Sequence, residues 1–276
     1  MTAVGQAAPA KRTQTGFPAA RIAGWVFMTL WIVLGAQLAW KLTSDFDAEF
    51  FGKYFPKLLE GLVVTLELVA LSMVLGGLLS IPVALARVSR NRLVSRLAFF
   101  YVYLFRGTPL LAQTFLVYYG AGQFRPWFED MNLWWFFRDA FNCVILAFTL
   151  NEAAYLAEIL RGSIQAVPRG QTEAAQSLGI PKAVTFWKVV MPQAMIIALR
   201  PFGNEIILMI KASAVASVVT VFDLMGATRL AFARSFNFDI YLWAALIYLS
   251  MVEVLRRVWD RIETRLTRHI GYGVSK

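Results

Sequence analysis

The distribution of apolar residues along the chain constrains its fold more than any other feature. Apolar blocks alternate with shorter segments that hold most of the charged residues. A helix needs about 20 consecutive apolar residues to cross a bilayer. The pattern therefore predicts an all-α integral membrane protein with about six transmembrane helices. The candidate blocks lie at 22–40, 62–86, around 110–119, 141–160, 195–221 and 240–254.

The composition supports this class, because 58% hydrophobic and 16% charged residues make the chain too apolar for an ordinary soluble domain. The third block is the shortest, since Pro109 interrupts it and Arg106 precedes it. The first block has a basic flank, as a signal peptide does. It is longer than a signal-peptide core and no Ala-x-Ala site follows it, so we expect an uncleaved helix at 21–42. We expect residues 1–20 to be a disordered cytoplasmic N-terminus.

Basic residues predict the orientation in the membrane. With a cytoplasmic N-terminus and six crossings, most Lys and Arg residues fall on the cytoplasmic side, including those of the tail at 263–276. This asymmetry follows the positive-inside rule and places both termini in the cytoplasm of a multi-pass protein. The net charge of +10 then indicates contact with membrane lipid of the inner leaflet, and no nucleic acid partner is needed to explain it.

Two residue types are too rare to build common metal or disulfide sites. The chain holds one cysteine, Cys143, within an apolar block, and one histidine, His269, in the tail. An intrachain disulfide is therefore impossible. A zinc site built from two or three histidines is also excluded, and with it the common intramembrane metalloproteases. We expect no metal site.

A polar loop at 168–192 separates the fourth and fifth apolar blocks. Pro168 is expected to end the preceding helix, since proline cannot donate a backbone hydrogen bond. Thr172 is expected to cap a short helix that begins at Glu173. Gly179 is expected to end this helix in a left-handed conformation, and Pro181 to start the next one.

The side chains of this short helix indicate a contact surface. Glu173 places negative charge at the positive end of the helix dipole. Ala174 and Ala175 keep one side of the helix small, so that a neighbouring protein can approach closely. The pattern runs from Glu173-Ala174-Ala175 through Gly179 to Met191-Pro192.

This loop resembles the cytoplasmic coupling loop of bacterial ABC importer permeases. Two further segments resemble the branch of that family that carries polar amino acids, namely 105–110 (FRGTPL) and 151–159 (NEAAYLAEI). The segment 204–209 (NEIILM), with Lys211 and Ser213, is most similar to the histidine or basic amino acid and octopine or nopaline permeases. The resemblance covers about 57–262, which we take as the permease domain.

The resemblance implies the fold of a type I ABC importer transmembrane domain, in which five helices form the family core and the helix at 21–42 is an addition. It also implies an assembly in the bacterial inner membrane. Its expected partners are an ABC ATPase dimer, a second permease subunit that is identical or homologous, a periplasmic substrate-binding protein and an amino acid substrate. No Gly-x-x-x-x-Gly-Lys-Ser/Thr motif occurs in the chain. We therefore expect a transport subunit and not an enzyme, with no cofactor of its own and with ATP and Mg bound by the partner ATPase.

Polar residues inside the apolar blocks are functional candidates, because a charge at the bilayer centre costs about 2.5–3.5 kcal/mol. Asn204 and Glu205 fall in mid-block, where a carboxylate can bind a cationic substrate. The alternative is internal pairing of Glu205 with Lys211. Asn151 and Glu152, with Tyr155 one turn later, are also expected to line the pathway.

The other candidates have structural or gating roles in our interpretation. Glu158 and Arg161 are three residues apart on one helix, a spacing that allows an ion pair. The resemblance adds Arg106, Pro109 and Lys211 to this group and Ser213 to the substrate pathway. Glu173, Ala174, Ala175 and Gly179 are the expected ATPase-coupling residues.

Two function classes compete. The first is the permease subunit of an ATP-driven importer for polar, in our interpretation basic, amino acids or opines. The second is a self-sufficient secondary carrier or channel, in which Glu152 or Glu205 relays protons. The coupling loop favours the first class, because a self-powered carrier has no use for it. A membrane-embedded enzyme has little support, since no nucleophile–base motif is present.

Overall fold

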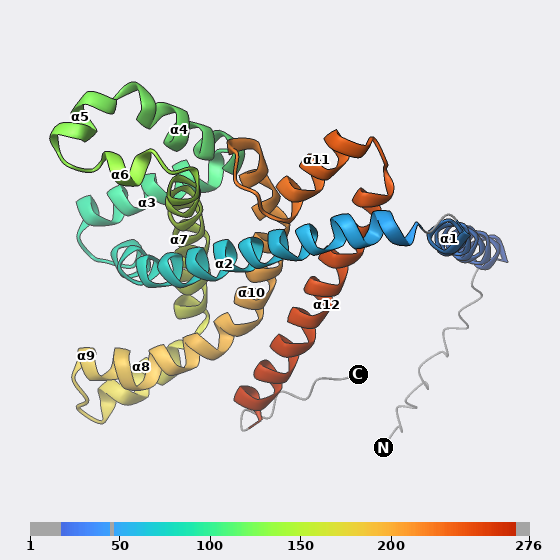
Figure 1. The fold of residues 1–276 in the computed structure, drawn as a ribbon. Helices are drawn as coiled ribbons and strands as arrows, with labels where there is room; N and C mark the ends of the chain where they lie inside the picture. Colours follow the sequence, from blue (N-terminus) through green and yellow to red (C-terminus); the bar gives the residue numbers. More distant parts are fainter. Residues whose placement is uncertain (1–17, 45–46, 269–276) are drawn as a thin grey trace, which may run out of the picture. The chain divides into compact units, whose positions relative to one another are not determined.

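A computed structural model describes residues 18–44 and 47–268 of the chain. Within these residues the chain is almost entirely helical and contains no strand. It divides into two compact units, residues 1–52 and 53–276. Helix α1 (Pro18–Ser44) belongs to the first unit, and α2 (Ala48–Arg87) begins there and continues into the second (Figure 1). Most of the N-terminal segment that we expect to be disordered lies outside the described residues, although its last three residues already belong to α1.

The second unit holds the remaining helices. Its middle part consists of α3 (Arg92–Gly107), α4 (Leu110–Gln123), α5 (Arg125–Asp130), α6 (Trp134–Phe137) and α7 (Ala140–Ala166). The polar loop contains α8 (Arg169–Ser177), α9 (Lys182–Thr185) and the π-helical segment η1 (Phe186–Val190). The chain then continues as α10 (Met191–Ala212), the 3-10 segment η2 (Ser213–Val219), α11 (Leu224–Ser235) and α12 (Asp239–Thr267).

Helix α7 is the centre of the second unit. It packs against α3, α4 and α10, and α10 in turn packs against α12 (Figure 1). Phe148 of α7 is completely buried in a core with Leu68 of α2, Ile210 of α10 and Val219 of η2. In contrast, Phe100 of α3 and many other large apolar side chains are exposed, as expected for surfaces that face lipid.

Four helical segments among the described residues are long and apolar enough to cross a membrane. They are Ala20–Lys41, Ala48–Arg87, Ala140–Ala166 and Lys182–Val219. These segments coincide with four of the six expected blocks. The all-helical membrane class is thus confirmed, while the expected number of six crossing helices is not.

The two remaining blocks differ from expectation. The block around 110–119 is only the second half of a broken helix pair, because α3 precedes α4 and only Thr108 and Pro109 separate them. The sequence prediction missed α3 as a helix. The block at 240–254 belongs to the much longer α12, whose second half is highly charged. The expected tail at 263–276 therefore begins as part of this helix, and residues 269–276 lie outside the described part.

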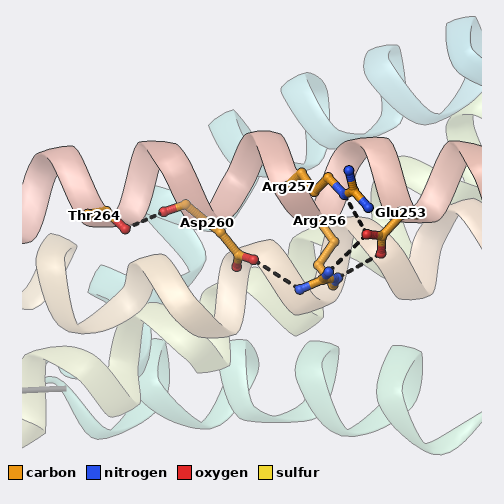
Figure 2. Close-up of polar contacts among 5 residues, drawn as sticks. All are labelled: Glu253, Arg256, Arg257, Asp260 and Thr264. Atoms are coloured by element: carbon orange, nitrogen blue, oxygen red, sulfur yellow. Dashed lines mark hydrogen bonds and ion pairs between the residues drawn. The ribbon is translucent and has the colours of Figure 1, made fainter. Parts of the chain in front are cut away.

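The charged half of α12 carries a chain of ion pairs, which Figure 2 shows. Glu253 accepts hydrogen bonds from Arg256 Nε at 2.9 Å and from Arg257 Nε at 2.6 Å. Arg256 also contacts Asp260 at 3.1 Å, and the Thr264 hydroxyl donates to the Asp260 carbonyl at 2.7 Å. Exposed pairs of this kind contribute little to helix stability, because solvent and salt screen them. Their main effect is to make this half of α12 a polar, water-facing end.

Candidate functional site

A pocket of about 650 Å³ opens where the α3–α4 break meets α7 and α10. We call it the membrane pocket. Seven of the candidate residues line it, and they come from all three of these parts of the fold. They are Arg106 and Pro109 at the break, Asn151, Glu152 and Tyr155 on α7, and Glu205 and Lys211 on α10.

The break beside the pocket is held by a polar network. The Asn151 amide donates to the Phe105 carbonyl at 2.9 Å and to the Gln113 side-chain oxygen at 3.0 Å. The Gln113 amide donates to the Phe105 carbonyl at 2.9 Å and to the Thr108 hydroxyl at 2.8 Å. These bonds satisfy carbonyls that the break leaves without helical partners. Asn151 therefore forms part of the wall of the pocket. The sequence analysis did not identify Gln113 as a member of this network.

The pocket carries both signs of charge. Glu152 is 2% exposed and its Oε1 has no hydrogen-bond partner. Glu205 is half-buried, whereas Lys211 is exposed, and the two form no ion pair with each other. The Arg106 guanidinium lies over the Tyr155 ring at 5.0 Å from its centroid, a cation–π contact. A pocket that holds acidic and basic side chains not paired with each other suits a ligand that carries opposite charges of its own.

Two candidates for the substrate pathway do not line the pocket. Asn204 is exposed on a different face of α10 from Glu205, its neighbour in sequence. Ser213 is completely buried, and its hydroxyl donates to the Ile210 carbonyl at 2.7 Å. In this conformation neither residue faces the space that Glu152 and Glu205 share.

Glu158 and Arg161 form the expected ion pair within α7. The structure adds a third member, since an Arg87 amino group at the end of α2 lies 3.6 Å from Glu158 Oε2. Arg161 also donates to the Gln165 side chain at 2.7 Å. None of these residues lines the membrane pocket, and the cluster joins α2 to α7.

The wall of the membrane pocket predicts a steric effect at Gly76 of α2. A Cβ atom at this position would lie 2.9 Å from the Glu152 Cβ, closer than real contacts allow. Gly76→Ala is expected to displace Glu152 and to lower stability by about 1–3 kcal/mol. The measurement is the melting temperature in detergent. Gly77→Ala is the matched control, because the nearest atom there is at 3.9 Å, and equal melting temperatures for the two variants would contradict this packing.

The polar loop forms a second candidate site. Pro168 follows the end of α7 at Ala166, as expected. Gly179 has a φ of 74° and ends α8 in the expected left-handed conformation. Its amide donates to the Gln176 carbonyl at 2.9 Å, and the Ile180 amide donates to the Ala175 carbonyl at 3.1 Å. These two bonds are those of a Schellman motif, which fixes how the chain leaves the helix.

Two expectations about this loop are wrong. Helix α8 begins at Arg169 and not at Glu173, so Thr172 lies inside the helix and does not cap it. Proline favours the start of a helix through its fixed φ, and Pro168 takes the N-cap position without a side-chain hydrogen bond. Ala175 departs from the second expectation, since it is 5% exposed and faces the chain's own interior, whereas Ala174 is exposed as expected.

The exposed face of α8 carries Glu173 and, just beyond it, Leu178. Glu173 forms no side-chain ion pair with any described residue, and Leu178 is 80% exposed. The exposed side chain of Leu178 can contact a partner protein. The sequence analysis did not identify Leu178, although an apolar residue next to the glycine that ends a helix can be recognised from the sequence.

The left-handed turn predicts the effect of a methyl group at Gly179. Gly179→Ala is expected to cost about 1–2 kcal/mol, because a Cβ disfavours positive φ, and so to loosen the end of α8. Hydrogen exchange of the Ile180 amide measures this loosening. Gly170→Ala is the control, since Gly170 lies inside α8 with an equally open surrounding. Unchanged exchange in Gly179→Ala would contradict the role of the turn.

Comparison with known proteins decides the family. The model of the family "binding-protein-dependent transport system inner membrane component" matches residues 55–268. The chain belongs to this family. It is therefore a multi-pass membrane permease subunit of an ABC transporter and not an enzyme, and the family resemblance of its motifs is confirmed.

Individual relatives agree with this assignment. The nopaline transport system permease protein of Agrobacterium fabrum is 41% identical over 83% of this chain and 95% of its own length. The histidine/lysine/arginine/ornithine transport system permease protein of Escherichia coli is 37% identical over 76% of this chain and 89% of its own. The crystal structure of an amino acid ABC transporter with histidines superimposes with a TM-score of 0.72 at 35% identity. The match covers 80% of this chain and 99% of that one.

Proposed function

We propose that this permease imports basic amino acids or opines and that the membrane pocket is part of their pathway. The observation that carries the proposal is the set of charges in this pocket. Every α-amino acid carries an ammonium and a carboxylate, and basic amino acids add a second cation. Glu152 and Glu205 offer carboxylates to the cations, and Arg106 offers a fork of donors to the carboxylate. Relatives that carry nopaline or histidine, lysine, arginine and ornithine agree with this choice.

The second part of the proposal concerns the source of energy for transport. Glu173 and Leu178 on the exposed face of α8 dock to an ABC ATPase, which binds ATP and Mg, and Gly179 holds the turn that follows. Rigid transfer of motion requires a helix whose end is fixed, and the Schellman motif supplies that fixed end. Ala174, exposed beside Glu173, contributes to the same contact. Ala175 acts indirectly, by packing α8 onto its own chain.

The partners and the orientation complete the proposal. A second permease subunit, identical or homologous, lies beside this chain, and a periplasmic binding protein delivers the substrate. The basic residues around α8 and along α12 favour a cytoplasmic location for both, with the two termini on the same side. Glu158, Arg161 and Lys211 support or gate the pathway, since the first two join helices and Lys211 lies at the rim of the pocket.

Recovery of partners tests this assembly. The tagged chain is purified from its native host in mild detergent, and bound proteins are identified by mass spectrometry. We expect a Walker-type ATPase and a second permease, and we expect the ATPase to be lost when Glu173 and Leu178 are both replaced. Replacement of Asp130, an exposed acid on α5, is the control and should leave the complex intact. Recovery of the chain alone, with transport in ATP-free vesicles, would instead support the self-sufficient carrier.

A further inference from the structure

A second large pocket lies beside α8, along a face next to the one that carries Glu173. It has a volume of about 830 Å³, and its walls come from the α2–α3 turn, the end of α7, α8, α9 and η1. Thr172 and Gln176 of α8 line it and are four residues apart, on one face of the helix. We call it the loop pocket. It is separate from the membrane pocket, with which it shares no lining residue.

The polar half of the loop pocket carries only positive charge. Arg90, Arg169 and Lys182 line it, and no carboxylate does. None of the three forms an ion pair with a described residue, in contrast to Arg161 and Arg256, which do. Three cations gathered around one concave space repel one another and attract an anion. The hydroxyl of Thr172 and the amide of Gln176 add neutral donors to the same walls.

The other half of the loop pocket is apolar. Ile164, Phe186 and Val190 line it, and Phe186 packs against a small core that includes Val190. This half lies at the ends of two apolar segments that are long enough to cross a membrane, Ala140–Ala166 and Lys182–Val219. The indole of Trp187, next to Phe186, is 52% exposed, as is usual for tryptophan at a membrane boundary. A ligand that fills this pocket completely therefore has an anionic part and an apolar part.

We propose that the loop pocket binds the phosphate headgroup of an anionic phospholipid from the adjacent leaflet. Arg90, Arg169 and Lys182 hold the phosphate, and the first part of an acyl chain lies along Ile164 and Phe186. A free phosphate would use the cations but leave the apolar half empty. Because α8 forms one wall, the bound lipid braces the helix that carries Glu173. This last step rests on the proposed coupling function, whereas lipid binding does not.

Native mass spectrometry of the detergent-purified complex measures retained lipid directly and without any transport. Phosphatidylglycerol and phosphatidylcholine are titrated against wild type and a triple variant, Arg90→Gln, Arg169→Gln and Lys182→Gln. Each basic residue near a membrane surface contributes about 1 kcal/mol to anionic lipid binding, so we expect phosphatidylglycerol to bind about 100-fold more weakly to the triple variant. Phosphatidylcholine should bind weakly to both proteins.

The control removes the same charge elsewhere. The control variant carries Arg92→Gln, Arg96→Gln and Arg265→Gln. These three arginines lie outside the loop pocket, are exposed, and pair with no described carboxylate. This control should retain phosphatidylglycerol as wild type does. An equal loss in both triple variants would overturn the proposal, since binding would then reflect the general basic surface. If the pocket variant does not fold, each of its single replacements should weaken binding about 5-fold by the same measurement.

Two further results would overturn the proposal. Displacement of the lipid by millimolar inorganic phosphate or glycerol 3-phosphate would identify a soluble phosphate compound as the ligand. Lipid bound to the isolated chain but absent from the complex with its ATPase would identify the loop pocket as a protein contact. A failure of the ATPase-docking proposal leaves the lipid titration unaffected, so that the two proposals can fail separately.

Discussion

Replacement of Glu173 by lysine is expected to abolish ATP-driven uptake while the protein still inserts and folds. Glu173 is exposed and forms no side-chain ion pair with the described part of its own chain, so its charge is available to a partner. Reversal of a charge at a protein contact places like charges together and costs about 2–5 kcal/mol. We therefore expect uptake to fall by about 100-fold or more, with ATP hydrolysis no longer stimulated by substrate. Uptake and hydrolysis are measured together in proteoliposomes.

The matched control is Asp130→Lys, the same reversal on the exposed surface of α5. It should leave both uptake and stimulated hydrolysis close to wild type. Glu173→Gln should fall between the wild type and Glu173→Lys, because it removes attraction without adding repulsion. Normal uptake by Glu173→Lys at normal expression would count heavily against a role in coupling.

Glu205→Gln is expected to reduce transport of cationic substrates far more than that of neutral amino acids. Glu205 lines the membrane pocket and has no ion-pair partner there, which leaves its carboxylate for a substrate cation. A hydrogen bond to a charged group contributes about 1.5–3 kcal/mol, so we expect the uptake efficiency for a cationic substrate to fall about 10- to 100-fold. Initial rates of arginine and glutamine uptake compare the two substrate types.

Glu67→Gln is the control for this comparison. Glu67 is an exposed residue of the apolar helix α2 and does not line the membrane pocket, so the same change there should affect neither substrate. An equal loss for arginine and glutamine in Glu205→Gln would refute selectivity at this residue. The Glu205 carboxylate would then have a structural role, as Glu158 has in its ion pair.

Features with strong local causes could be read from the sequence. The long apolar segments of α2, α7 and α10 follow from length and composition alone. The end of α7 before Pro168 and the left-handed turn at Gly179 follow from the backbone chemistry of proline and glycine. The Glu158–Arg161 pair follows from helical spacing.

Short helices and features that depend on tertiary contacts could not be read from the sequence. Helix α3 escaped prediction because its apolar run at 97–105 is too short to cross a membrane, although Asn91 caps its start. The role of Gln113 could be identified only from the fold, which places it at the break beside Asn151. Asn204 and Glu205 are neighbours in sequence, yet only Glu205 lines the pocket, because the orientation of α10 decides which face is inside. The inward position of Ala175 has the same cause.

A separate ATPase drives this permease in the proposed assembly. The most direct test is arginine uptake by the purified complex in proteoliposomes, with the binding protein added outside and ATP or a non-hydrolysable analogue enclosed. We expect uptake only with hydrolysable ATP, dependence on the binding protein, and no uptake by the permease alone under a proton gradient. Uptake by the permease alone, driven by that gradient and unaffected by ATP, would contradict this expectation and establish a secondary carrier.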